Sequence, residues 1–187
     1  ATQSALLKVA SSEITGVFVV EERSRGAGGS VLSTERDGQV LLWKISDGEA
    51  YRLLEVPKGA SSVAFCRPER LLAVSYRNVI RIFRISEAKE THNLSEFDAN
   101  VTDLQFSPDC RRVLAGTADG RVYQWMFKSA AEIANLSILE KQKLLEAYIG
   151  HPAIISALAY HPLGRVFFSA DWKGNLSAWL NYEADSF

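Results

Sequence analysis

The pattern of apolar and polar residues divides the chain into short strands separated by tight turns. Residues 100–127 hold three apolar runs of strand length, at 101–106, 113–115 and 122–125. A Ser-Pro-Asp sequence separates the first two runs, and Asp119-Gly120 separates the last two. Pro presets φ in such turns, and Asp-Gly supplies the positive φ angles of a tight hairpin. The segment is therefore expected to form three antiparallel strands.

The same unit recurs on both sides of this segment. A large aromatic residue marks the third strand of each unit, and gaps of 40, 42 and 54 residues separate Trp43, Phe83, Trp125 and Trp179. A period near forty with about four strands per unit is typical of a β-propeller with four-stranded blades. The other strands are expected at 4–9, 14–20, 31–34, 39–44, 51–56, 61–65, 71–75, 79–85, 91–94, 155–160, 166–170 and 175–180.

Composition and charge are those of an ordinary globular protein. The chain has 187 residues, a net charge of −1 and 47% hydrophobic residues, so a sizeable core is possible and nucleic acid is not expected as a direct ligand. No apolar run reaches the roughly 18 residues of a spanning helix, and we see no signal peptide. We therefore expect a cytoplasmic or nuclear location. Cys66 and Cys110 lack metal-site or redox spacing, so two buried, reduced thiols are expected.

Several units resemble WD repeats, which form β-propellers. Gly150-His151, Tyr160-His161-Pro162 and Trp179 resemble the Gly-His … Trp-Asp frame of that family, with Leu180 where Asp is usual. Asp37-Gly38 and Asp119-Gly120 match the aspartate turn before the third strand. The resemblance covers almost all of the chain except an inserted segment.

In this family, a hydrogen-bonded tetrad of His, Ser or Thr, Trp and Asp locks each blade. The resemblance implies tetrad-type structural roles for His151, Ser169, Trp179, Ser33, Asp37, Trp43, Asp119 and Trp125. No unit is complete in the sequence. Phe97 and Ala115 stand at the His and Ser positions of the third unit, Phe83 replaces Trp in the second, and Lys173 stands where Asp belongs in the fourth.

The domain organisation follows from this resemblance. Residues 1–187 are expected to form one propeller portion with successive blades at 10–57, 58–95, 96–149 and 150–187, the last incomplete. Residues 1–9 would be the outer strand of a neighbouring or last blade. A capping box at Ser129 and Glu132 within 128–143 indicates an inserted helix or long loop. Because seven blades are usual in the family, we expect a larger, about seven-bladed propeller whose remaining blades come from the same or another chain.

No residues outside the repeat positions have the pattern of a catalytic or metal site. His92, His151 and His161 lack metal-ligand spacing, and we find neither a phosphate-binding glycine loop nor a nucleophile elbow. We expect no cofactor and no enzymatic activity. A propeller hydrolase is the less favoured alternative, because it would need convergent carboxylates or a metal near the axis.

A binding surface is predicted at the end of the blades where the hairpins between second and third strands lie. Trp172 precedes one such hairpin, and Arg36, Tyr76 and Ala118 are taken as its equivalents. The neighbouring candidates are Glu13, Thr15, Ser61, Asn100, Thr102, Ile154 and Ser156. Exposed Trp, Tyr and Arg together have the composition of a binding hot spot, so the sequence predicts a non-catalytic scaffold that binds other proteins within a larger complex.

A basic group in the second unit leaves an alternative open. It consists of Arg67, Arg70, Arg77, Arg81 and Arg84. These residues could bind a phosphopeptide or a phosphoinositide. The favoured interpretation is that Arg81 and Arg84 are solvated strand positions, because Glu69, Glu87 and Glu90 are interspersed among these arginines.

Overall fold

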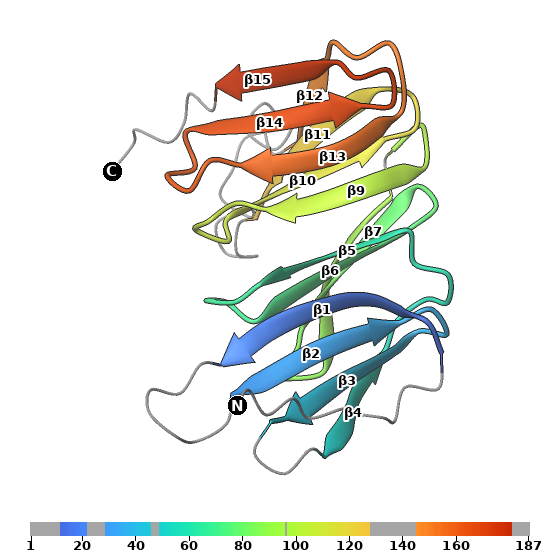
Figure 1. Ribbon diagram of the computed structural model, residues 1–187, viewed down its shortest axis with the longest axis vertical. Helices are drawn as coiled ribbons and strands as arrows, with labels where there is room; N and C mark the ends of the chain where they lie inside the picture. The colour runs from blue at the N-terminus through green and yellow to red at the C-terminus, as the bar shows by residue number, and fades with distance from the viewer. Residues whose placement is uncertain (1–11, 22–28, 46–48, 96, 128–144, 181–187) are drawn as a thin grey trace, which may run out of the picture.

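The chain folds into a row of antiparallel β-sheets. The computed structural model describes residues 12–21, 29–45, 49–95, 97–127 and 145–180. Within them lie fifteen strands, arranged in four separate sheets. Figure 1 shows the sheets following one another along the long axis of the molecule, from blue at the bottom to red at the top. Each sheet is one blade of a propeller.

Each blade runs through its strands in chain order, from an inner first strand outward. Blade 1 contains β1 (Ile14–Glu21), β2 (Ser30–Glu35), β3 (Gln39–Lys44) and β4 (Ala50–Glu55). Blade 2 contains β5 (Ser62–Cys66), β6 (Leu71–Tyr76), β7 (Val79–Arg84) and β8 (Lys89–Leu94). Blade 3 contains β9 (Val101–Phe106), β10 (Arg112–Thr117), β11 (Arg121–Met126) and β12 (Leu145–Ile149). Blade 4 contains β13 (Ile155–Tyr160), β14 (Val166–Asp171) and β15 (Leu176–Leu180).

The core lies between the blades. Strand pairing places Tyr160, Phe167 and Trp179 on one face of blade 4, and this face packs against Leu114 and Val122 of blade 3. The corresponding faces of blades 3 and 2 pack against the preceding blade in the same way. Blades therefore stack face to face, because each contact between successive blades buries apolar side chains from both sheets.

The predicted fold class is confirmed: the described chain is all-β, with antiparallel sheets of the propeller type. Blade 2 is more regular than the sequence suggested, because its fourth strand extends over Lys89–Leu94. The described part of blade 4 has three strands. The expected outer strand at 1–9 and the expected insertion at 128–143 lie outside the described residues. In the described part of the chain, no helix has the length and hydropathy needed for a membrane span.

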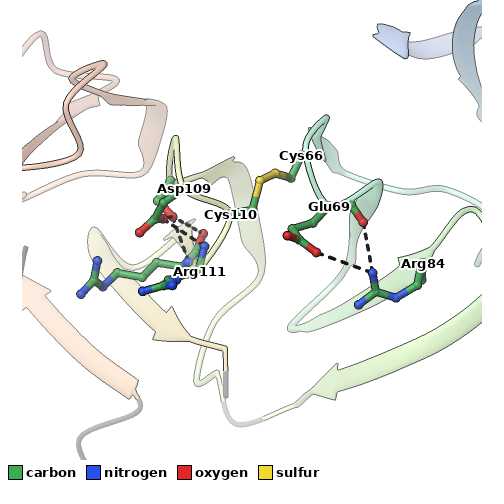
Figure 2. Close-up of a disulfide and its surroundings, with 8 residues drawn as sticks. Cys66, Glu69, Arg84, Asp109, Cys110 and Arg111 are labelled. Atoms are coloured by element: carbon green, nitrogen blue, oxygen red, sulfur yellow. Dashed lines mark hydrogen bonds and ion pairs between the residues drawn. A yellow bond between two sulfur atoms is a disulfide. The ribbon is translucent and has the colours of Figure 1, made fainter. Parts of the chain in front are cut away.

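The two cysteines form a disulfide, which corrects the expectation of reduced thiols. Figure 2 shows Cys66, at the end of β5 in blade 2, joined to Cys110, in the turn before β10 of blade 3. Their Cα atoms are 5.8 Å apart, although 44 residues separate them in the sequence. Both side chains are buried. The spacing of the two cysteines in the sequence did not indicate a disulfide, because the stacking of blades 2 and 3 brings them together.

Candidate interaction surface

One end of the blades, here called the upper rim, carries the hairpins between second and third strands and the residues that precede the inner strands. A repeated main-chain hydrogen bond holds the two parts together. The amides of Arg36, Ala118 and Trp172 donate to the carbonyl oxygens of Glu13, Asn100 and Ile154 at 2.8, 2.9 and 3.1 Å. Candidates that are distant in sequence are therefore neighbours in blades 1, 3 and 4.

Trp172 is one of the most exposed large hydrophobic residues at this end of the blades, with 73% of its surface accessible. Its hairpin is held by Asp171, whose Oδ1 atom accepts from the amides of Lys173 and Asn175 at 2.9 and 3.0 Å. The Nδ2 atom of Asn175 donates to Oδ2 of Asp171 at 2.9 Å. The backbone under this exposed indole is therefore well defined.

The other predicted anchors have different environments. Arg36 forms an exposed ion pair with Glu13 across the rim of blade 1. Leu72 of β6 pairs with Phe83, just as Phe167 of β14 pairs with Trp179. When positions are counted from these paired residues, Arg77 rather than Tyr76 is the equivalent of Trp172. Tyr76 is the half-buried end of β6, and the Arg77 guanidinium lies 5.3 Å from its ring centroid. Blade 2 therefore presents the exposed Arg77 at this position, because its hairpin is shorter.

Four predicted surface residues form a row of hydroxyls at equivalent positions of the inner strands: Thr15, Ser61, Thr102 and Ser156. Two of them fasten neighbouring blades. The Oγ of Ser61 donates to the Val101 carbonyl at 2.8 Å, and Oγ1 of Thr102 donates to the Ile155 carbonyl at 2.7 Å. Thr15 bonds Thr34 within its own blade. Ser61 and Thr102 therefore have a structural role that sequence reasoning missed.

Asp103 extends this fastening to three blades, and the sequence analysis did not single it out. Its Oδ1 accepts from Ser62 Oγ of blade 2 at 3.1 Å, and its Oδ2 accepts from the Leu158 amide of blade 4 at 2.8 Å. Burial raises the pKa of Asp103, although these bonds and one from the Leu104 amide act in the opposite direction. The residue links the inner strands rather than facing a substrate.

Blade 4 contains a complete four-residue network. Nε1 of Trp179 donates to Oγ of Ser169 at 2.7 Å, and this Oγ lies 2.6 Å from Nε2 of His151. Nδ1 of His151 lies 3.2 Å from Asp171 Oδ2. Because the charged Asp171 carboxylate can only accept, Nδ1 of His151 carries the proton that they share. In the neutral imidazole, Nε2 then accepts from the Ser169 hydroxyl, which itself accepts from the indole of Trp179. Lys173 does stand at the usual Asp position, but Asp171, two residues earlier, supplies the carboxylate.

The Asp171 carboxylate is held in its charged form. Burial alone would raise its pKa, but hydrogen bonds from the side chain and amide of Asn175, from His151 and from the Lys173 amide lower the pKa of Asp171 to about 2. The hydrogen bonds that this carboxylate accepts come from His151, Lys173 and Asn175, which all belong to blade 4 or the segment that leads into it. Its role here is structural, as expected for a tetrad.

The other predicted tetrad residues form partial networks. In blade 1, Trp43 Nε1 donates to Ser33 Oγ at 2.7 Å, while Asp37 accepts from the amide and side chain of Gln39 at 3.1 and 2.9 Å. In blade 3, Asp119 Oδ1 accepts from Thr117 Oγ1 at 2.5 Å. Phe97 fills the His position and packs edge-on against Tyr123 at 5.1 Å, beside the partly buried Trp125.

The predicted basic group does not form one surface. Arg67 and Arg70 lie at the lower end of blade 2, beside the turn that leads into β6, whereas Arg77 lies on the upper rim. Arg81 pairs with Glu90 at 3.7 Å. Arg84 contacts Glu69 at 3.7 Å, as Figure 2 shows, and Glu87 at 3.5 Å. The positive charge of the strand positions is thus balanced locally. In the described residues, no cluster of three or more His, Cys, Asp or Glu side chains could hold a metal ion.

Comparisons with known proteins agree with this geometry. The chain superposes on the WD40 β-propeller domain of Doa1 with a TM-score of 0.68 and 19% identity, over 94% of this chain and 54% of that chain. It superposes on the computationally designed Ika4 protein with a TM-score of 0.69 and 20% identity, over 96% and 98% of the respective chains. The fold is therefore that of a β-propeller built from WD-type blades.

Sequence comparison identifies the repeats. Residues 88–126 and 142–179 match the family description "WD domain, G-beta repeat". The chain is 24% identical over 153 residues to human "WD repeat and HMG-box DNA-binding protein 1", and 22% identical to the Xenopus laevis protein of that name. It spans only 12% of the length of these relatives. Residues 88–126 and 142–179 are therefore WD-type repeats, within a chain that has the fold of a β-propeller.

Proposed function

We propose that this propeller is a non-catalytic scaffold that binds other proteins through its upper rim, as a subunit of a larger complex. The observation that carries the proposal is the exposure of Trp172 on a hairpin fixed by Asp171. An aromatic side chain that is exposed on a rigid support loses little conformational entropy when a partner covers it. WD40 propellers generally act in this way, and enzymatic activity is not a general property of the fold.

The expected partner presents an apolar pocket or side chain to Trp172 and polar groups to its surroundings. Arg36 and Arg77 on the hairpins of blades 1 and 2, together with Glu13 and Asn100 before two inner strands, would contribute polar contacts elsewhere on the upper rim. Thr15, Tyr76, Ile154 and Ser156 complete the proposed set, whereas Ser61 and Thr102 are already engaged between blades. Trp172 is thus the proposed energetic centre of this surface.

The test compares Trp172→Ala with Leu163→Ala, because Leu163 is equally exposed at 74% but lies in the lower turn of the same blade. Both variants and the unmodified chain are used to capture proteins from an extract, and captured proteins are quantified by mass spectrometry. We expect a set of proteins lost with Trp172→Ala and retained with Leu163→Ala, at unchanged melting temperature. If the two variants capture the same proteins, or if Trp172→Ala unfolds the blade, the proposal fails.

Binding of a phosphopeptide or phosphoinositide by the arginine group is less well supported, since Arg81 and Arg84 already contact glutamates. We infer that the chain does no chemistry, because the carboxylates of Asp171 and Asp103 are engaged in hydrogen bonds within and between blades.

We further propose an intracellular location, cytoplasmic or nuclear. The relatives are named as DNA-binding proteins, and this supports a nuclear location among the two. A disulfide is uncommon in such reducing compartments. The oxidation state of Cys66 and Cys110 in cells would therefore be an independent indicator of where the protein resides.

A further inference from the structure

The two ends of the blade row expose apolar sheet faces. In blade 4, strand pairing puts Ala157, Ala170 and Leu176 on the face opposite to the one that packs on blade 3. Phe168, Ala178 and Leu180 share that face. Leu176 and Leu180 are 72% and 57% exposed. We call this surface, defined by these six residues, the open face.

The open face is more apolar than the corresponding face of blade 3, which is covered. There, Asp103, Gln105 and Gln124 occupy positions that hold Ala157, Ala159 and Ala178 in blade 4. A fully apolar sheet face that stays in water is unfavourable and is normally buried by another element. The open face is therefore built to be covered.

The other end of the row exposes the matching surface. The inner strand of blade 1 leaves Ile14, Val17 and Val19 exposed at 46%, 61% and 47%. Their counterparts by register are buried against the preceding blade: Val101 and Ile155 at 1% and 0%, Leu104 and Leu158 at 3% and 8%, and Phe106 at 5%. Among the described residues, these three side chains of β1 have no preceding blade to pack against, unlike their counterparts in every later blade.

We propose that the open face of one copy of this chain docks on the inner strand of blade 1 of a second copy, so that two copies close head to tail into one ring. Within the row, each blade packs on the preceding one. Blade 1 of one copy could pack in the same way on blade 4 of the other copy. The row corresponds to 54% of the WD40 propeller domain of Doa1, so two copies hold about the number of blades of a complete ring. Such a contact is heterologous and closes by two-fold symmetry.

The hydroxyl row specifies a contact in this interface. Ser61 and Thr102 each donate to the carbonyl of the residue that precedes the next blade's hydroxyl. Continuing the series, Ser156 Oγ donates to the Ile14 carbonyl of the second copy. Ala170 occupies the position of Gly116, which makes room for Ile155. Because Ala170 has a Cβ, the proposed contact with Ile14 of the second copy requires a wider spacing at this point than the contact between blades 3 and 4.

Light scattering on the purified chain tests the proposal, which does not depend on the proposed function. We expect a mass of twice 20.7 kDa that stays constant as the concentration rises. Leu176→Asp and Val17→Asp should each give the single-copy mass, because each places a charge in one side of the contact. Leu163→Asp, a charge at an equally exposed leucine in the lower turn, should leave the mass unchanged.

Several outcomes would overturn the proposal. A single-copy mass for the unmodified chain would mean that other blades or another protein cover the open face. Masses that grow beyond two copies would mean that the ring does not close. A two-copy mass for Val17→Asp would mean that the open faces pair with each other. Leu180→Asp serves as a second variant if circular dichroism shows that Leu176→Asp is unfolded.

Discussion

The Nδ1 atom of His151 lies 3.2 Å from a carboxylate oxygen of Asp171, and both side chains are fully buried. Asp171 also holds the hairpin that carries Trp172. The Asp171 carboxylate therefore belongs to the network that stabilises blade 4 and also supports the hairpin of the proposed binding residue, Trp172. A change at Asp171 is expected to affect both.

The first prediction concerns the pH dependence of stability. Because the pKa of Asp171 is lowered to about 2 in the fold, from about 3.9 in an unfolded chain, its stabilising contribution is present above about pH 4 and is lost as the pH falls toward 2. Asp171→Asn should lower the melting temperature at pH 7 and flatten the loss of stability between pH 5 and 2. Melting curves for variant and unmodified chain that run parallel over this range would contradict the assignment.

Asp103 should have the opposite effect on the pH dependence of stability. Its pKa is raised by burial, so the charged form is disfavoured in the fold and stability decreases as the pH rises through the titration of this carboxyl. Asp103→Asn removes the charge and can still accept from the Leu158 amide, so it should keep or increase stability at pH 7. Asp103→Ala leaves that amide without a partner and should cost roughly 1–3 kcal/mol.

The measurement for Asp103 is the free energy of unfolding in urea at pH 3, below the ordinary pKa of a carboxyl group, and at pH 8. The Asn variant should differ from the unmodified chain more at pH 8 than at pH 3. Equal destabilisation by Asn and Ala at both values would mean that the ionised carboxylate itself is required.

The Cys66–Cys110 disulfide should stabilise the contact between blades 2 and 3. For a cross-link across 44 residues, the chain-entropy relation gives about 4 kcal/mol. Reductant should therefore lower the melting temperature of the unmodified chain, while a Cys66→Ser, Cys110→Ser double variant should be insensitive to it. Detection of two free thiols in the non-reduced, unfolded chain would show that the bond is absent.

A matched pair of variants separates the bond from the backbone at Cys110. Cys110 has φ of 59°, a left-handed conformation that favours glycine. Both Cys110→Ser and Cys110→Gly remove the disulfide, but only Gly relieves the backbone strain, which is about 1–2 kcal/mol. Cys110→Gly should thus be the more stable of the two in urea unfolding.

Gly116 should be intolerant of a side chain because it touches blade 4. A Cβ at this position would lie 2.4 Å from Cγ2 and 2.8 Å from Cβ of Ile155, which is completely buried. Gly116→Ala should destabilise the chain by about 1–3 kcal/mol through overpacking. A double-mutant cycle with Ile155→Ala should show coupling between the two sites, and strict additivity would mean that they do not clash.

The order of strands, the period near forty and the positions of the hairpins could be predicted from the sequence by itself. These features depend on local causes: apolar runs of strand length, Asp-Gly and Ser-Pro-Asp turns, and one large aromatic residue on each third strand. The partners of Trp43 and Trp179 on the second strand, Ser33 and Ser169, follow from the same repeat. The fold class was therefore accessible without coordinates.

Contacts between blades were decided only by the tertiary structure. The pairing of Cys66 with Cys110 and the bridge from Asp103 to blades 2 and 4 depend on how separate sheets stack. The ion pairs of Arg81 and Arg84 lie within blade 2 and depend on how its strands and turns come together. Lys173 stands at the position where the family has the tetrad Asp. Asp171, two residues earlier at the end of β14, supplies the carboxylate instead, because its side chain reaches His151. Repeat patterns encode each blade, but the direction and reach of individual side chains determine what each blade touches.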